Sequence, residues 1–401
     1  MAGDWPAVPL GDVLTLQRGF DLPIQDRKEG RIPIVSSSGI SGSHSVAKVA
    51  APGVVTGRYG TIGQVFYVTE DFWPLNTTLY VKDFKGNDPH FVSYLLRTID
   101  YEAHNDKSTV PGVNRNHLHT TLVRLPPLPE QRTIAGILGA LDDKIELNRR
   151  MNETLEAMAR AIFTSWFVDF DPVRAKMEGR QPFGMDADTA ALFPDSLDDS
   201  SLGLIPSSWV VRAFSDTIEL LGGGTPKTSI GAYWGGHIPW YAVVDAPRTS
   251  DVWVIKTDKA ITQAGLDNSS AQVMPMGITI ISARGTVGKC AMTGVPMAMN
   301  QSCYGIRGKN ERSNFFTYFS VRHIVSALQR GSHGSIFDTI TRDTFKTIDV
   351  VVPSALLAQR FDETVAPYMQ CILSNLQESS TLTVIRDILL PKLLSGRLQL
   401  L

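Results

Sequence analysis

The stretch Ala283-Arg-Gly-Thr-Val-Gly288 is a close copy of Arg58-Tyr-Gly-Thr-Ile-Gly63, at an offset of 225 residues from Gly60 to Gly285. Two further pairs keep a similar offset, namely Asn76-Thr-Thr-Leu-Tyr80 with Asn300-Gln-Ser-Cys-Tyr304 and Asn114-Arg-Asn-His-Leu118 with Thr341-Arg-Asp-Thr-Phe345. A period this long exceeds the short units that stack into solenoids. The chain therefore carries a duplicated domain.

The two copies differ in length near their middles. Arg31-Ile-Pro-Ile34 resembles His237-Ile-Pro-Trp240 at an offset of only 206 residues, so the second copy carries extra residues between Trp240 and Arg284. Short apolar runs between Gly, Pro and Ser turns predict strands in both copies, among them 65–68, 79–81, 278–281 and 348–352. Helical patterns cover 90–100 and 315–328. We expect two duplicated α/β (α+β) modules with many short strands.

Each copy is followed by a long helical pattern. A heptad walk from Ile134 to Trp166 and another from Phe361 to Leu393 mark coiled-coil seams. Pro367 should kink or interrupt the second helix, and Arg386 falls on its seam and must snorkel to solvent. A helix over 130–167 would be roughly 55 Å long at ~1.5 Å per residue. The two helices should pair as an antiparallel coiled-coil spacer.

Both walks become polar in the middle. Asn148 corresponds to Asn375 at the repeat offset, and an antiparallel pair would bring these positions together. A polar residue at a seam position specifies register. The residues expected to fix the register of the spacer helices are Asn148, Asn152, Asn375 and Ser379.

Composition limits the class of protein. The chain has 401 residues, a formal net charge of −2 and three cysteines, without the spacing of a zinc site or of a disulfide framework. No run approaches the ~20 apolar residues of a membrane span, and the first residues do not resemble a signal peptide, so we expect a cytoplasmic protein. Residues 168–208 hold 3 basic and 8 acidic side chains, whereas 209–352 hold 14 and 10. The second copy is thus mildly basic.

The common catalytic motifs are missing from the sequence. The glycines of 57–63 and 222–228 do not have the order of a phosphate-binding loop or a dinucleotide-binding turn, and no serine-hydrolase elbow or zinc-protease motif occurs. We therefore expect no catalytic residue and no metal site. Two alternatives stay open at this point: a nucleotide hydrolase that uses Gly57–Gly63, and a purely structural scaffold.

Two modules on a rigid spacer suit a reader of double-stranded DNA, because B-DNA presents the same groove every ~34 Å. Arginine and lysine suit guanine and phosphate, and asparagine suits adenine. A surface ion pair or a backbone contact is the alternative role for each. The candidates lie on turns, several at equivalent places in both copies: Arg58, Asn114, Arg115, Asn116, Lys227, Arg284 and Arg342.

Several ordered motifs now support a family resemblance. They are Trp5 with Val8-Pro-Leu-Gly-Asp12, Gly223-Gly-Thr-Pro226, Tyr233-Trp-Gly-Gly-His-Ile-Pro-Trp240, Ser165-Trp-Phe-Val-Asp-Phe-Asp-Pro172 and Leu389-Leu-Pro-Lys-Leu-Leu-Ser-Gly-Arg-Leu398. The chain resembles the specificity subunit of type I restriction-modification enzymes over nearly its whole length. The resemblance implies target recognition domains at 1–126 and 209–352, spacer helices at 127–168 and 353–401, and an acidic connector at 169–208.

The resemblance also implies partners and cofactors. It implies assembly with two modification subunits, which bring S-adenosylmethionine, and with motor-nuclease subunits that use ATP and Mg; none of these cofactors is expected on this chain. The charged helix face Glu146, Arg149, Arg150 and Glu153 either docks the modification subunits or is simply solvated. A stand-alone recognition protein, or one that has exchanged its partners within a related defence system, is the alternative.

Overall fold

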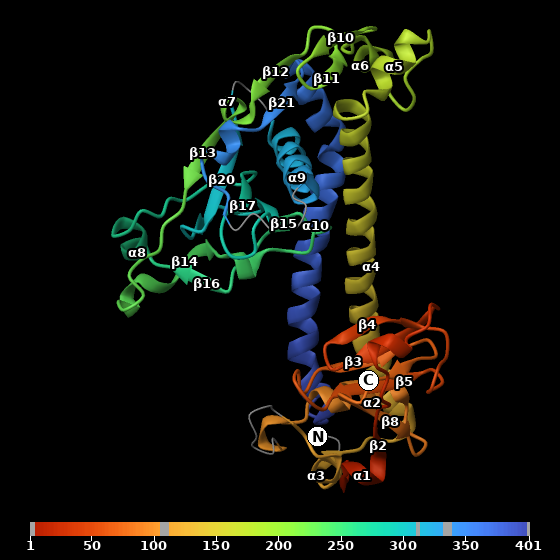
Figure 1. The fold of residues 1–401 in the computed structure, drawn as a ribbon. Coiled ribbons are helices and arrows are strands. Elements are labelled where there is room, and N and C mark those ends of the chain that lie inside the picture. The colour runs from red at the N-terminus through yellow and green to blue at the C-terminus, as the bar shows by residue number, and fades with distance from the viewer. Residues whose placement is uncertain (1–4, 105–111, 310–312, 332–338, 399–401) are drawn as a thin grey trace. The chain divides into compact units, whose positions relative to one another are not determined.

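The computed structural model describes the chain apart from residues 1–4, 105–111, 310–312, 332–338 and 399–401. The chain divides into two compact units, one made of Met1–Ile145 with Thr381–Leu401 and the other of Glu146–Ser380. Each unit holds one copy of the repeat (Figure 1). We call the elements before the first long helix module 1, and those from β12 to β21 module 2.

Module 1 is built on a four-stranded sheet in the order β2-β8-β5-β6, with a three-stranded sheet β4-β3-β7 and the pair β1-β9. Its strands are β1 (Ala7–Pro9), β2 (Thr15–Arg18), β3 (Ile32–Ser36), β4 (Gly39–His44), β5 (Gly53–Gly57), β6 (Val65–Val68), β7 (Trp73–Pro74), β8 (Thr78–Asp83) and β9 (Leu122–Arg124). Its helices are α1 (Leu10–Val13), η1 (Ile24–Asp26), α2 (Pro89–Arg97), η2 (Glu102–His104) and α3 (Arg115–His119).

Module 2 repeats this plan. Its main sheet has the order β13-β20-β17-β18-β15, beside β16-β14-β19 and the pair β12-β21. The strands are β12 (Val210–Ala213), β13 (Ile218–Gly222), β14 (Trp234–Tyr241), β15 (Trp253–Val254), β16 (Lys259–Ile261), β17 (Thr279–Ser282), β18 (Cys290–Thr293), β19 (Ala298–Met299), β20 (Cys303–Gly308) and β21 (Asp349–Val352). The helices are α7 (Phe214–Thr217), η3 (Gly231–Tyr233), η4 (Val243–Asp245), α8 (Gln263–Asp267), α9 (Asn314–Gly331) and η5 (Thr344–Lys346).

The strand orders match element by element, with β2, β8, β5 and β6 of module 1 at the places of β13, β20, β17 and β18 of module 2. The predicted duplication of a mixed helix-and-sheet domain is therefore confirmed. Module 2 has η4 and β15 between β14 and β16, where module 1 joins β3 directly to β4. These elements account for extra residues in the second copy.

Two long helices follow the modules, α4 (Leu128–Phe167) and α10 (Ala355–Leu394), each of 40 residues. They pack together, and the pairing is antiparallel, since contacts from Asn152 to Asn375 are followed by contacts from Asn148 to Ser379. The prediction that Pro367 interrupts the second helix is wrong, because α10 is continuous from Ala355 to Leu394. A kink at Pro367 stays a prediction. Val365 and Met369 on either side of the proline are fully buried, so tertiary packing holds the helix together there.

The segment between α4 and β12 has more structure than a plain connector. It folds into α5 (Asp171–Met177), α6 (Ala187–Ala191) and the hairpin of β10 (Leu197–Ser200) with β11 (Gly203–Pro206). Aromatic residues attach it to unit 2: Phe170 lies at 5.6 Å from Trp209, and Phe193 at 5.3 Å from Trp166, between ring centroids.

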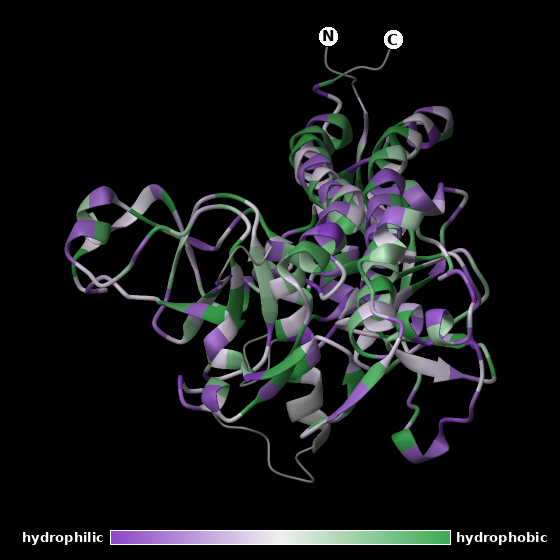
Figure 2. Ribbon diagram, turned by 90° about the horizontal axis from the view of Figure 1, so that it is seen from above, coloured by the Kyte–Doolittle hydropathy of each residue, from purple (hydrophilic) through white to green (hydrophobic). Residues whose placement is uncertain are grey.

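Each unit has its own hydrophobic core. In unit 1, Phe91, Tyr94 and Leu95 of α2 pack with Leu138 of α4 and Leu393 of α10. In unit 2, an aromatic cluster joins both long helices to α9, with members Phe163, Trp166, Phe316, Phe319 and Phe361. Seen from above, the helical turns carry both hydrophobic and hydrophilic residues (Figure 2). Within the described ranges, no helix has both the length and the apolar character needed to cross a membrane.

Candidate nucleic-acid interface

Three loops of module 2 meet at one end of its main sheet. β13 and β17 both pair with β20 in the antiparallel sense, so that Gly222 lies opposite Tyr304 and Ser282 lies opposite Cys303. The ends of β13 and β17 therefore lie beside the start of β20. This topology brings together the loops 223–227, 284–288 and 300–302, which we call the module 2 loop cluster.

Close backbone contacts hold this cluster. A Cβ added at Gly223 would collide with the carbonyl oxygen of Asn300, so the approach of the two loops requires glycine. The Thr225 hydroxyl and the Gln301 amide oxygen are hydrogen-bonded, and the backbone N–H of Ala283 donates to the carbonyl of Ser302 at 2.8 Å. The loops form one connected surface.

The cluster surrounds a cavity with basic and amide side chains. Its volume is about 570 Å³, and its lining is Val243, Val244, Arg284, Gly285, Thr286, Lys289, Asn300 and Ser302. Lys289 also lines a neighbouring cavity of about 420 Å³, together with Arg248 and Arg322. Within the described part of the chain, Arg284 and Lys289 are exposed and form no ion pair. Cations and amides of this kind suit phosphates and base edges.

Module 1 forms the same arrangement. The backbone N–H of Arg58 donates to the carbonyl of Thr77 at 2.9 Å, and the Asn76 amide donates to Asp21. Gly19 occupies the place of Gly223, since an added Cβ would collide with the carbonyl of Leu75. The module 1 loop cluster therefore consists of 19–21, 58–63 and 75–77.

The predicted base-contacting residues gather at these clusters. In module 1, Val113 donates its N–H to the carbonyl of Arg58 at 3.0 Å. The residues that follow Val113, which are Asn114, Arg115 and Asn116, therefore begin beside the turn 58–63. In module 2, Ile340 donates to the carbonyl of Ala283 at 2.9 Å, and this places Arg342 beside the turn that carries Arg284. Lys227 ends the neighbouring loop and is exposed.

Two of these candidates have visible structural roles. The Asn114 side chain accepts a hydrogen bond from the N–H of Asn116 at 3.0 Å and caps α3. The Arg58 guanidinium lies 4.5 Å from the ring centre of Tyr59. Arg115, Asn116, Lys227, Arg284 and Arg342 are exposed on the described surface. Contact of any of them with DNA remains a prediction.

The sequence analysis missed three residues of module 2. Lys289 and Asn300 line the cavity, and Gln301 completes the loop beside them. The signal was present for the last two, because they open the repeat unit Asn300-Gln-Ser-Cys-Tyr304 that matches Asn76-Thr-Thr-Leu-Tyr80. Lys289 gave no such signal, since Gln64 stands at its place in the first copy.

The polar residues of the helix pair lie in contact. Asn148 is fully buried and donates to Glu378 at 2.8 Å, to the Ser379 hydroxyl at 3.2 Å and to the Asn375 carbonyl at 3.4 Å. The Asn375 amide donates to the Asn152 side-chain oxygen at 2.9 Å. That these contacts fix the register stays a prediction.

The charged face of α4 is internally paired. Arg149 forms ion pairs with Glu146 at 2.6 Å and with Glu153, and Arg150 pairs with Glu146 at 2.8 Å. Hydrogen bonding from Arg149 lowers the pKa of Glu146 to about 2. Glu146 is therefore ionised at neutral pH, and this paired face is compatible with either of the two roles considered for it.

The fold and its loop clusters define a class of protein: a duplicated module with two loop clusters that carry arginine and amide side chains, and a paired-helix element. The family described as "Type I restriction modification DNA specificity domain" matches residues 2–157 and 206–362. The chain therefore belongs to the family of type I restriction-modification specificity proteins. Members of this family are DNA-recognition components and not catalysts.

Individual relatives agree with this assignment. The chain is 29% identical over 357 residues to the HindI specificity subunit of Haemophilus influenzae, covering 77% of each chain. It is 28% identical over 179 residues to the MjaIX specificity subunit of Methanocaldococcus jannaschii, covering 44% of this chain and 41% of that one. The fold resembles the crystal structure of the type I S subunit from M. genitalium, with a TM-score of 0.60, 17% identity and coverage of 98% and 96%.

Proposed function

We propose that the chain reads an asymmetric DNA target in two halves, one for each loop cluster, for a type I restriction-modification enzyme. The observation that carries this proposal is the presence of one loop architecture twice with different side chains. At matching places the first cluster presents Tyr59 and Gln64, and the second presents Arg284 and Lys289. Since base preference follows side-chain chemistry, the two half-targets differ.

The charge of this chain provides only modest electrostatic affinity for DNA phosphates. The formal net charge is −2, and the acidic excess outside the modules offsets the basic second copy. Neutralised phosphates supply most of the affinity of DNA-binding proteins, so partner subunits contribute much of the grip. We propose that the partners are two modification subunits, with S-adenosylmethionine bound to them, and motor-nuclease subunits that use ATP and Mg, in the cytoplasm.

The α4 surface in unit 2 suits the docking of a modification subunit. Leu147, Met151 and Met158 are 53%, 37% and 43% exposed and share one helix face, next to the ion-paired Glu146 and Arg149. An apolar stripe with a charged rim is typical of an interaction surface. Met151→Glu with Met158→Glu should abolish co-purification with the modification subunit, whereas Ala157→Glu on another face should not. Retention of the complex in the double variant would contradict this docking surface.

The reading function is tested by sequencing the methylated bases of a host that expresses the chain with its partners. We expect one split, asymmetric motif. Arg284→Gln should change the preferred base in one half-target only, and Lys289→Gln should weaken all targets and reduce the slope of log K against log salt by about 1. Lys256→Gln, an exposed lysine that lines neither cavity, is the matched control. A palindromic or ungapped motif would contradict the proposal.

A further inference from the structure

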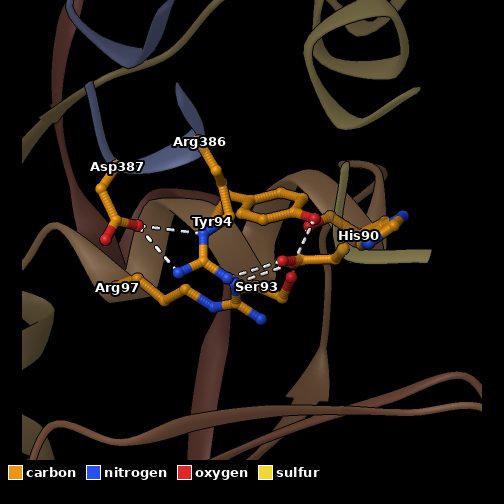
Figure 3. A network of polar contacts seen from close by, with 7 residues as sticks. His90, Ser93, Tyr94, Arg97, Arg386 and Asp387 are labelled. Carbon is orange, nitrogen blue, oxygen red and sulfur yellow. Dashed lines mark hydrogen bonds and ion pairs between the residues drawn. The ribbon is translucent and has the colours of Figure 1, made fainter. Parts of the chain in front are cut away.

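A partly buried carboxylate in unit 1 ties module 1 to both long helices. Asp142 of α4 accepts hydrogen bonds from the Tyr94 hydroxyl at 2.8 Å and from Arg97 at 3.1 Å, both on α2. Arg386 of α10 donates to the other oxygen of Asp142 at 2.7 Å, and also to Asp387 at 2.8 Å. Figure 3 shows Tyr94, Arg97 and Arg386 converging on this point. One side chain therefore joins three elements.

This network is largely shielded from solvent. The side chains of Arg97, Asp142 and Arg386 are 27%, 26% and 23% exposed, and Tyr94 is fully buried. Burial opposes ionisation of Asp142, but the hydrogen bonds from Arg386 and Tyr94 and the charge of Arg97 outweigh it and hold its pKa below the ordinary value. The predicted snorkelling of Arg386 to solvent is thus replaced by an ion pair within unit 1.

Unit 2 contains a counterpart. Arg322 of α9 forms an ion pair with Glu156 of α4, and the two side chains are 16% and 5% exposed. Arg322 also lies 5.6 Å from the ring centre of Tyr318, as Arg97 lies 4.8 Å from that of Tyr94. Burial opposes the charge of Arg322, but Tyr318 and Glu156 outweigh it and raise the pKa of the guanidinium.

The two networks are alike in part. Arg97 and Arg322 are 225 residues apart, which is the offset of the repeat at the glycine turns, whereas Tyr94 and Tyr318 are 224 apart, so that the tyrosine precedes the arginine by three residues in one copy and by four in the other. The tyrosine and the arginine lie on α2 in module 1 and on α9 in module 2, the longest helix of each module among the described residues. A spacing of three or four residues places the two side chains on one helix face. Both acids belong to α4, so they are not copies of one another in the repeat. The loop clusters differ between the copies, whereas an arginine close to a tyrosine on this helix occurs in both.

We propose that Asp142 and Glu156 are positioning residues that fix the angle of each recognition module on its own stretch of the helix pair, and that they thereby set how strictly the protein measures the gap between half-targets. This inference rests on the proposed reading of a split target. It assigns a role in specificity to residues that lie outside both loop clusters.

The energetics favour positioning over simple stabilisation. Buried ion pairs are often no more stable than apolar residues of the same volume, but they accept fewer alternative geometries. One added base pair in the gap moves the second half-target by about 3.4 Å and turns it by about 34°. A module held by directional hydrogen bonds cannot follow that rotation at low cost, whereas a module held by apolar packing can slide or tilt. We call the networks around Asp142 and Glu156 the unit 1 anchor and the unit 2 anchor. Both anchors should weaken the binding of targets whose gap differs from the native one.

The test uses the full chain in complex with its modification subunits and a duplex series in which both half-targets stay constant. The gap is the native one, or is shortened or lengthened by one base pair. The double variant Glu156→Leu with Arg322→Met replaces the unit 2 anchor by apolar side chains, and Asp142→Asn weakens the unit 1 anchor. Glu219→Gln with Arg307→Met removes an exposed ion pair of module 2 and is the matched control. Methylation rate and thermal stability are measured for each.

We expect both anchor variants to lose about tenfold in preference for the native gap, corresponding to ~1.4 kcal/mol, while they keep their half-target preference and, in the double variant, their Tm. The control variant should keep its gap preference, its half-target preference and its Tm. If the double variant fails to fold, Asp142→Asn decides the question. Unchanged gap preference in the folded variants would overturn the positioning role. A wild-type chain that prefers no split target would instead refute the proposed function and is recognised before any variant is made.

Discussion

Replacing the asparagines inside the helix pair by leucine should increase the thermal stability of unit 2 and make the register of the two helices less specific. Asn152 and Asn375 are 1% and 8% exposed, and their side chains are joined by one hydrogen bond of 2.9 Å. We consider the single variant Asn152→Leu and the double variant Asn152→Leu with Asn375→Leu. The single variant leaves the buried Asn375 amide with only the sulfur of Cys371, at 3.8 Å.

The magnitudes follow from these contacts. An unsatisfied buried amide costs about 1–3 kcal/mol. A fully buried leucine gains roughly 1.5–3 kcal/mol. In the single variant these terms largely cancel, whereas the double variant removes the penalty and adds a second leucine. The double variant should therefore be more stable than the single one by about 2.5–6 kcal/mol. At ~2–4 °C per kcal/mol for a unit of this size, its Tm should be roughly 5–24 °C higher.

Register is measured separately with a disulfide. The sulfur of Met151 lies 4.0 Å from that of Cys371, so the two side chains face each other, and Met151→Cys brings a second thiol near Cys371 in the native register, where oxidation can join the helices. In the double leucine background we expect a lower yield of this disulfide, because a polar pair that excludes shifted alignments has been lost. An undiminished yield, together with the higher Tm, would refute the register role and would show that the aromatic core of unit 2 aligns the helices alone.

Three further outcomes follow from individual contacts. Gly139→Ala should destabilise unit 1 by about 1–3 kcal/mol, because the added methyl would lie 2.6 Å from the ring of His90, while Gly136→Ala on the same helix meets nothing and should stabilise by roughly 0.5–1 kcal/mol; calorimetry that gave the same sign for both would contradict this reasoning. Burial raises the pKa of Asp362 to about 6, above its unfolded value of about 3.9, so its protonated form contributes stability that is complete below about pH 4 and is lost as the pH rises through 6. Asp362→Asn should flatten this dependence of Tm on pH, and an unchanged profile would count against it. Gly223→Ala should separate two loops of the module 2 cluster and weaken DNA binding without affecting the unfolding of unit 1, and wild-type affinity would show that this close approach is not needed.

The sequence predicted the architecture well because the architecture is repeated. Turn motifs such as Arg58-Tyr-Gly-Thr-Ile-Gly63 occur twice, and each copy ends in a heptad pattern, so two independent signals support each element. The continuous helix through Pro367 could not be foreseen, because what keeps it intact is the burial of Val365 and Met369 against distant residues. Local propensity carries no information about such tertiary support.

The candidate site was predicted in part. Arg284 and Arg342 were found because they stand in repeated turns, and the backbone bond between Ile340 and Ala283 brings them together. Lys289 was missed because its place in the first copy holds Gln64. A comparison of the copies finds what they share, but the residues that distinguish two half-targets are expected among those they do not share.

The anchors illustrate the opposite limit. Asp142 and Arg386 are 244 residues apart in sequence, so nothing in either helical pattern connects them, although their ion pair is 2.7 Å long in unit 1. Both copies nevertheless have a tyrosine and an arginine close together on one helix, Tyr94 with Arg97 and Tyr318 with Arg322, while the side chains of the loop clusters differ. If loops read bases and anchors hold angles, then the half-targets can change without a change in the gap. Substitutions in the loop clusters should therefore alter the bases of the methylated motif and leave its gap intact, and substitutions in the anchors should do the reverse.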